Sequence, residues 1–209
     1  MSDIFELQDE ITKNIVSALD IHLLVGEQGR FWSSSTNNVE AWEYFRQARN
    51  LLDAYRSEDV PEVKRLINKV LELDPGYATA WSILAGVHFH VEEDARNSVE
   101  IRKEALMLTL ACSEQALKCD PDCAATYADL GLYYLALKDY EKAFLNVNKA
   151  VELTPDFAST LRISAVILNK CGHPEIALEQ IRKAMRLCPV YPMWYLTNLG
   201  QVTRILGHT

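Results

Sequence analysis

The sequence lacks several features that would each point to a particular class of protein. It has no apolar run near the roughly 20 residues that a membrane-spanning helix needs, so we expect no membrane association. No basic and apolar leader opens the chain. Its five cysteines are an odd number, which favours reduced thiols in the cytoplasm over a disulfide framework. The motifs GxSxG, GxGxxG and GxxxxGKS/T are absent. We therefore predict a cytoplasmic protein without a catalytic site.

The cysteines and histidines do not form a convincing metal-binding pattern. Cys119 and Cys123 have metal-like spacing, and Cys112 precedes them, but no suitably spaced histidine pair follows. His88 and His90 lie two residues apart on an expected helix and point to different faces. We interpret these cysteines instead as small apolar residues that pack between the helices of an array. We predict no metal ion and no cofactor.

The net charge of −8 argues against nucleic acid as a partner. The charge is uneven, because residues 1–156 carry a net charge of −12 and residues 157–209 carry +4. One interpretation is that the exposed faces of the array simply vary. The other is that a basic end receives an acidic peptide or another domain.

Four prolines give the chain its period. Pro121, Pro155 and Pro189 are 34 residues apart, and Pro75 precedes them by one such period plus 12 residues. Each follows an apolar helical pattern, and proline disfavours helix at the residue before it. A repeat of about 34 residues is typical of stacked helix-turn-helix units.

Hydrophobic periodicity places helices between these prolines. An amphipathic helix over residues 3–24 and a polar linker over 26–38 precede the array, and Asp59 and Asp139 are expected to cap helices. The extra 12 residues, around 92–97, either lengthen a helix or form a loop. The expected helices of the array are 39–55, 60–73, 77–91, 98–119, 123–137, 140–153, 157–170, 175–187 and 192–206.

Two units match one consensus closely, with small residues where helices must approach and large ones where gaps must be filled. The third unit has Tyr127, Leu130, Gly131, Tyr134, Ala143, Val147, Ala150 and Pro155, and the fourth has Leu161, Ala165, Leu168, Ala177, Ile181, Ala184 and Pro189. This pattern resembles the tetratricopeptide repeat (TPR). The resemblance implies an all-α fold, a right-handed TPR superhelix (α-solenoid) of antiparallel helix pairs. Residues 1–38 would form a junction helix and linker, and 39–209 about four and a half pairs, truncated at the C-terminus.

A second, shorter resemblance concerns residues 3–19, which begin Asp3-Ile4-Phe5-Glu6-Leu7. They look like a junction segment of bacterial multidomain signalling proteins that carry an adenylate/guanylate cyclase domain or a winged-helix DNA-binding domain upstream of TPRs. The resemblance implies that the chain is a fragment. No cyclase metal carboxylates and no winged-helix motif are found in this chain itself.

The TPR resemblance implies a ligand surface on the concave face, lined by the first helix of each pair. Phe89, Leu132 and Val166 would supply apolar contacts, and Arg162 and Lys170 would pair with acidic groups. The arginine, lysine and asparagine clamp of chaperone-tail-binding members is absent. The candidate binding residues are Ser82, Phe89, His90, Asp129, Leu132, Arg162, Val166, Asn169 and Lys170.

These observations predict a scaffold for signal transduction, a regulatory module that binds a protein, a peptide or a neighbouring domain of the same protein. The alternative is a self-association module that forms a homodimer and so dimerises an attached catalytic or DNA-binding domain. It is motivated by residues 192–206, a first helix with apolar residues Trp194, Leu196 and Leu199 whose partner helix would follow beyond Thr209.

Overall fold

The computed structural model describes residues 36–54, 57–94, 98–188 and 193–207. In these ranges all the regular structure is helical, which confirms the all-α prediction. The predicted helix over residues 3–24 and most of the predicted linker lie outside the described residues. The elements are α3 (Val39–Ala54), the 3₁₀ turn η1 (Ser57–Asp59), α4 (Val60–Leu73), α5 (Ala78–Asp94), α6 (Val99–Cys119), α7 (Ala124–Ala136), α8 (Tyr140–Leu153), α9 (Ala158–Lys170), α10 (Pro174–Leu187) and α11 (Met193–Ile205).

The predicted helices of the array are all found, with boundaries shifted by at most a few residues. Part of the 12-residue insertion lengthens α5, which continues to Asp94. Asp139 caps α8 as predicted, because its carboxylate accepts a hydrogen bond from the Lys142 N–H at 3.2 Å. Asp59 precedes α4 as predicted, but its side chain makes no capping hydrogen bond.

The chain divides into two compact units, unit 1 (Met1–Tyr77) and unit 2 (Ala78–Thr209). In unit 1, α3 packs against α4. Asn38 begins α3 by accepting a hydrogen bond from the Ala41 N–H at 3.0 Å, and its amide donates to the Leu73 carbonyl at 3.2 Å. Phe45 stacks on Tyr77 with ring centroids 4.7 Å apart. These contacts connect the start and the middle of α3 with the end of α4 and with Tyr77, which follows it.

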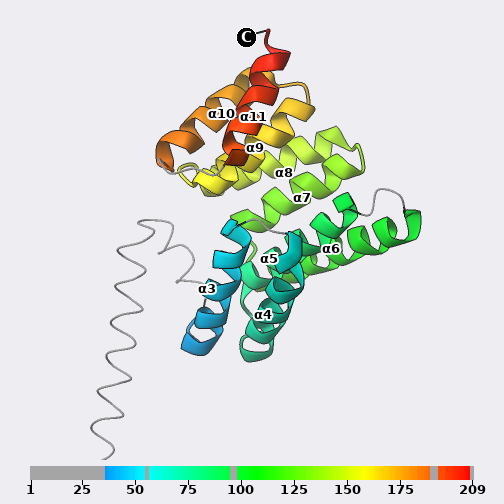
Figure 1. Ribbon diagram of the computed structural model, residues 1–209, viewed down its shortest axis with the longest axis vertical. Helices are drawn as coiled ribbons and strands as arrows, with labels where there is room; N and C mark the ends of the chain where they lie inside the picture. The colour runs from blue at the N-terminus through cyan, green and yellow to red at the C-terminus, as the bar shows by residue number, and fades with distance from the viewer. Residues whose placement is uncertain (1–35, 55–56, 95–97, 189–192, 208–209) are drawn as a thin grey trace, which may run out of the picture. The chain divides into compact units, whose positions relative to one another are not determined.

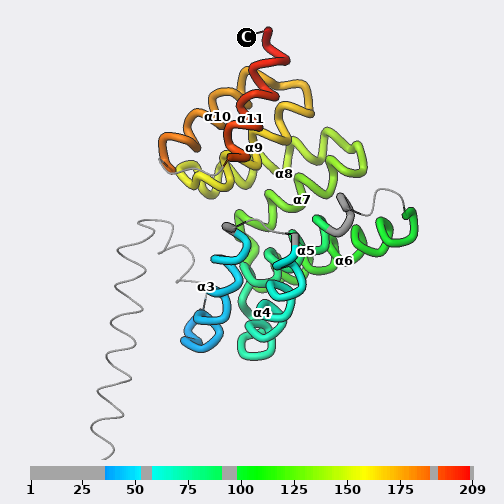
Figure 2. The backbone as a smooth tube through the Cα atoms, in the orientation of Figure 1, coloured from blue at the N-terminus to red at the C-terminus, as the bar shows by residue number. Residues whose placement is uncertain are grey.

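Unit 2 is built from the pairs α5/α6, α7/α8 and α9/α10, followed by α11, which packs on α9 and α10 (Figure 1). The backbone trace shows how the pairs α7/α8 and α9/α10 each reverse direction through a short turn (Figure 2). At the turn between α9 and α10, Gly172 has a φ of +88°, a conformation that glycine adopts without strain. One continuous core runs through the later repeats, formed by Ala143, Val147, Leu161, Ala165, Ile167, Leu168, Ala177, Ile181, Ala184, Tyr195 and Val202.

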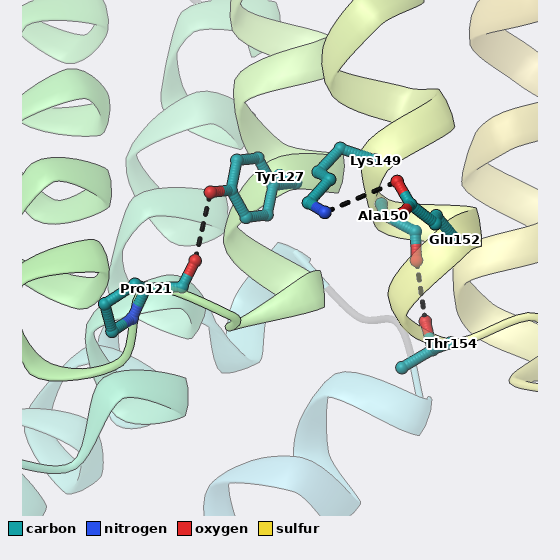
Figure 3. Close-up of polar contacts among 6 residues, drawn as sticks. All are labelled: Pro121, Tyr127, Lys149, Ala150, Glu152 and Thr154. Atoms are coloured by element: carbon teal, nitrogen blue, oxygen red, sulfur yellow. Dashed lines mark hydrogen bonds and ion pairs between the residues drawn. The ribbon is translucent and has the colours of Figure 1, made fainter.

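Polar contacts support the proline-containing turns between repeats (Figure 3). The Tyr127 hydroxyl, on α7, donates to the Pro121 carbonyl at 3.0 Å. At the end of α8 the Thr154 hydroxyl donates to the Ala150 carbonyl at 3.0 Å and lies 3.0 Å from the Thr160 hydroxyl. The Tyr127 bond connects α7 to the turn that precedes it, and the Thr154 hydroxyl adds a second hydrogen bond to the Ala150 carbonyl, which already accepts the Thr154 N–H.

The sequence predicts that small residues such as Gly131 let neighbouring helices approach closely. Replacing Gly131 with alanine tests this prediction, and the same replacement at Gly200 is the control. A Cβ on Gly131 would lie 2.8 Å from Cδ1 of the fully buried Ile167, whereas a Cβ on Gly200 would meet nothing within 4 Å. We expect Gly131→Ala to lower the free energy of unfolding by about 1–2 kcal/mol, since overpacking outweighs the better helix propensity. We expect Gly200→Ala to raise it by up to about 1 kcal/mol. Urea unfolding measures both, and equal stabilisation by the two changes would contradict the packing argument.

Candidate functional site

The first helices of unit 2 follow one another in contact: α5 touches α7, α7 touches α9, and α9 touches α11. Side chains at equivalent repeat positions therefore lie on neighbouring helices. We call the surface that carries the candidates the first-helix face. It is defined by Ser82, Gly86, Phe89, His90, Asp129, Leu132, Arg162, Val166, Asn169 and Lys170.

The clearest contact on the first-helix face joins two predicted residues, Ser82 of α5 and Asp129 of α7. The Ser82 hydroxyl, which is almost completely buried, donates a hydrogen bond to Oδ2 of Asp129 at 2.5 Å. One turn along α5, Gly86 leaves space beside the other carboxylate oxygen, because a Cβ there would lie 3.8 Å from Oδ1. The sequence register predicted that these residues share a face, and the structure brings them into contact.

The environment of Asp129 changes its ionisation. Burial raises the pKa of its carboxyl to about 7, and the Ser82 hydrogen bond and the positive charge that His90 can carry only partly oppose this rise. Because Ser82, Gly86 and His90 are spaced four residues apart on α5, they lie on one side of that helix. The Ser82 proton already points to the carboxylate, so this group does not have the serine–histidine order of a nucleophilic triad.

The other end of the first-helix face carries the predicted cations. Arg162 of α9 is half-buried, and its Cζ lies 6.0 Å from the centroid of the Tyr195 ring of α11. Lys170, at the end of α9, is exposed. A cation–π contact of this kind holds the guanidinium against the Tyr195 ring. Arg162 therefore has a fixed orientation, while the Lys170 side chain is accessible to solvent.

The apolar candidates differ in what they offer to a ligand. Phe89 is only 8% exposed, which corrects the prediction that it supplies a contact surface: its ring is part of the packing inside unit 2. Leu132 is half-buried and packs against the core of the later repeats, and Val166 is half-buried. Of the three apolar candidates, Leu132 and Val166 therefore keep part of their surface exposed.

On the first helices α9 and α11, two side-chain amides have buried atoms without a hydrogen-bond partner. They are Oδ1 of Asn169, on α9, and Nδ2 of Asn198, on α11. Buried polar atoms in proteins are nearly always hydrogen-bonded. Asn198 was not among the predicted residues, although the repeat register, carried into the fifth pair, places it where Asp129 stands in the third.

Much of the positive charge of residues 157–209 lies on α10, a second helix, and away from the predicted candidates. Arg182, Lys183 and Arg186 line an open hollow there together with Glu179 and Gln180. Lys183 pairs with Asp156 at 2.8 Å. The charge count along the sequence contained this signal, but it did not separate first helices from second helices.

The remaining chemical predictions concern metals and membranes. In the part of the chain that the structure describes, no three His, Cys, Asp or Glu side chains gather as a metal site would require. Cys119 is exposed and Cys123 is buried, and burial raises the pKa of the Cys123 thiol. Among the described helices, none combines the length and the apolar character that crossing a bilayer demands.

Comparison with known sequences gives a partial match. No protein-family model matches the chain. A curated relative, "Putative adenylate cyclase 3" of Rhizobium meliloti (strain 1021), is 35% identical over 85 residues. The match covers 41% of this chain and 14% of that protein, so the chain corresponds to a small part of the relative's length.

Comparison with solved structures covers most of the chain. A thermophilic TPR protein of Thermus thermophilus superimposes with a TM-score of 0.64 at 18% identity, over 95% of this chain and 96% of that one. The APC/C hetero-tetramer Cut9-Hcn1 gives 0.60 at 21% identity, over 87% of this chain and 32% of that chain. The pilF protein of Pseudomonas aeruginosa gives 0.53 at 20% identity, over 80% and 69%. At these identities the likeness concerns the fold.

Proposed function

We propose that this chain, whose fold is that of the tetratricopeptide-repeat proteins, is a docking module that binds a peptide or a neighbouring protein domain on the first-helix face of unit 2. The observation that carries the proposal is the distribution of charge on this face, with Asp129 on α7 and Arg162 and Lys170 on the adjacent α9. Solenoid repeats build extended surfaces of this kind by stacking.

Two further observations support a peptide as the ligand. The unpartnered atoms of Asn169 and Asn198 are one acceptor and one donor, and a peptide backbone presents both complementary groups once the amides turn toward it. Leu132 stands one turn from Asp129 on α7 and Val166 one turn from Arg162 on α9, and both keep part of their surface exposed. A peptide with apolar side chains beside its charged groups would match this arrangement.

The partial match to a cyclase supports a regulatory setting. We propose that the chain belongs to a larger bacterial signalling protein, in which the module docks a partner or an adjacent domain and so controls an attached activity. The junction-like sequence at residues 3–19 supports the same setting.

Charge reversal at the basic end tests the docking proposal. The probe is a displayed library of random eight-residue peptides, from which binders of the wild-type chain are selected and resynthesised. We expect Arg162→Glu combined with Lys170→Glu to weaken binding of the selected peptides at least tenfold, because charge-assisted hydrogen bonds to acidic groups are lost. Fluorescence polarisation measures the affinity.

The matched control is Lys183→Glu combined with Arg186→Glu, which makes the same change in charge on α10. We expect this control to alter affinity less than threefold. Unchanged binding after reversal of Arg162 and Lys170, or failure of the library to yield any binder, would contradict docking on the first-helix face.

The alternative function, self-association, draws support from α11. Its residues Met193, Leu196 and Ile205 are 75%, 44% and 56% exposed, a large apolar surface for one helix. A second copy that covers this face would dimerise whatever is attached. Sedimentation across a concentration series measures the oligomeric state of the chain. A monomer at every concentration would rule out self-association.

A further inference from the structure

We infer that the ligand of the first-helix face presents a lysine or arginine side chain to Asp129, in the gap beside Gly86. This inference rests on the proposed docking function and specifies the chemistry of the ligand. It adds a cation-binding position to the acidic-group position predicted at Arg162 and Lys170.

The first step in the argument is the geometry of the carboxylate. Oδ2 accepts the hydrogen bond of Ser82, and no hydrogen bond to Oδ1 is found within the described residues. A carboxylate oxygen accepts up to two hydrogen bonds, so at least Oδ1 has capacity left. The missing side chain at Gly86 leaves the approach to Oδ1 open, since even a Cβ would only reach ordinary contact distance.

The second step concerns lysine and arginine as partners of Asp129. Two other carboxylates of unit 2 pair with a nearby lysine, Asp139 with Lys142 at 3.0 Å and Asp156 with Lys183 at 2.8 Å. Asp129 is half-buried, and across the described ranges no lysine or arginine pairs with it. Withdrawing a carboxylate from water without a lysine or arginine beside it is unfavourable, and a basic ligand group supplies that charge.

The third step surveys the charged groups around this carboxyl. α7 packs against α5, α6, α8 and α9. From α5, His90 acts on the pKa of Asp129, and at the start of α7 burial and, to a smaller extent, the charge of Asp129 raise the pKa of the Cys123 thiol. From the described parts of α6, α8 and α9, no charged group shifts the pKa of Asp129. Arg162, on α9, faces Tyr195 of α11 instead.

The ligand chemistry follows from the number of protein ligands. A metal ion would need several oxygen or nitrogen donors, and one carboxylate with one hydroxyl is too few. An ammonium or guanidinium needs only one carboxylate for a charge-assisted hydrogen bond. We therefore assign the position to a basic side chain of a docked peptide.

The spacing of the two charged positions predicts a motif. Asp129 and Arg162 stand on neighbouring first helices, and packed helices lie about 8–10 Å apart. An extended peptide that crosses them covers this distance with about three residues. The expected ligand therefore has a basic residue and an acidic residue about three positions apart.

The peptides selected from the eight-residue library test the motif and the carboxylate together. We expect enrichment of basic and acidic residues about three positions apart. Asp129→Asn, which keeps the size of the side chain, should weaken binding of such a peptide roughly 10- to 100-fold, and replacing the peptide's basic residue with norleucine should weaken it as much. Combining Asp129→Asn with the norleucine peptide should weaken binding little more than either change alone, because both changes remove the same interaction.

A pH series separates recognition of charge from a purely structural role. Because Asp129 must ionise to bind a cation, we expect the affinity of the wild-type chain to rise about tenfold from pH 6 to pH 8 and the affinity of Asp129→Asn to stay nearly constant. His90 acts on the Asp129 carboxyl from α5, so His90→Gln is the control variant, and it should keep most of the rise in affinity.

The outcomes distinguish this inference from the docking function on which it rests. Peptides that depend on Arg162 and Lys170, but show no basic residue and no effect of Asp129→Asn, would overturn the inference and leave docking intact. A library that yields no binder would overturn both. Circular dichroism of each variant confirms that lost binding does not reflect lost helix.

Discussion

Ile181→Ala is expected to lower the free energy of unfolding of unit 2 by about 2–5 kcal/mol. Ile181 lies on α10, is fully buried, and belongs to the core that joins the later repeats. Removing its outer carbons leaves a cavity between α9, α10 and their neighbours, which the helices fill only in part. Urea or thermal unfolding followed by circular dichroism measures the loss.

The same helix offers a matched control. Ile176, in the first turn of α10, is 42% exposed, so Ile176→Ala makes the same chemical change without opening a cavity in the core. We expect it to change stability by less than about 1 kcal/mol. Equal losses for the two variants would show that the buried cluster is not the source of stability in this part of the chain.

The location of the effect is a further check. In a repeat array each helix pair contacts only its neighbours, so stability is close to a sum of local terms. Hydrogen exchange in the Ile181→Ala variant should therefore accelerate most in α9, α10 and α11 and least in α5 and α6. Uniform acceleration across unit 2 would indicate one cooperative block instead.

The fold of this chain could be predicted well because its rules are local. Proline at a fixed period ends each second helix, and residues such as Gly131 and Ile181 fall on buried faces because helical periodicity repeats within every unit. Asp139 capped its helix as predicted because a cap depends on a few consecutive residues. Asp59 did not, because its backbone is helical (φ −84°, ψ −13°), whereas a capping residue is typically extended.

The candidate site could be predicted only in outline. The repeat register placed Ser82 and Asp129 on the same face, but their hydrogen bond depends on the packing of α5 against α7, and helical periodicity does not contain that information. For the same reason Phe89 was assigned to the surface and lies in the interior. The positive charge of residues 157–209 was counted correctly, yet only the structure shows that Arg182, Lys183 and Arg186 of α10 line one open hollow.

Asp129→Asn is expected to stabilise unit 2 above neutral pH and to remove a pH dependence that the wild-type chain shows. The pKa of the Asp129 carboxyl is about 7 in the folded state, against 3.8 for an ordinary aspartate. Since the folded-state pKa is raised, the stabilising contribution of the protonated form is complete below about pH 4 and is lost as pH rises to about 7. The full loss corresponds to roughly 4 kcal/mol, as an order of magnitude.

Denaturant unfolding of both chains at several pH values between 4 and 8 measures this difference. The wild-type chain and Asp129→Asn should have similar stabilities near pH 4, and the variant should become increasingly more stable as pH rises toward 8. A difference in the free energy of unfolding between the two chains that does not change with pH would contradict the raised pKa.

A basic peptide should reduce this difference at pH 8, because it stabilises the ionised carboxylate of the wild-type chain, which is unfavourable without a bound cation. The stability that the chain loses by keeping an aspartate at this position is then recovered on binding. This recovery gives a half-buried carboxylate, with no lysine or arginine partner among the described residues, a physical role in the proposed docking surface.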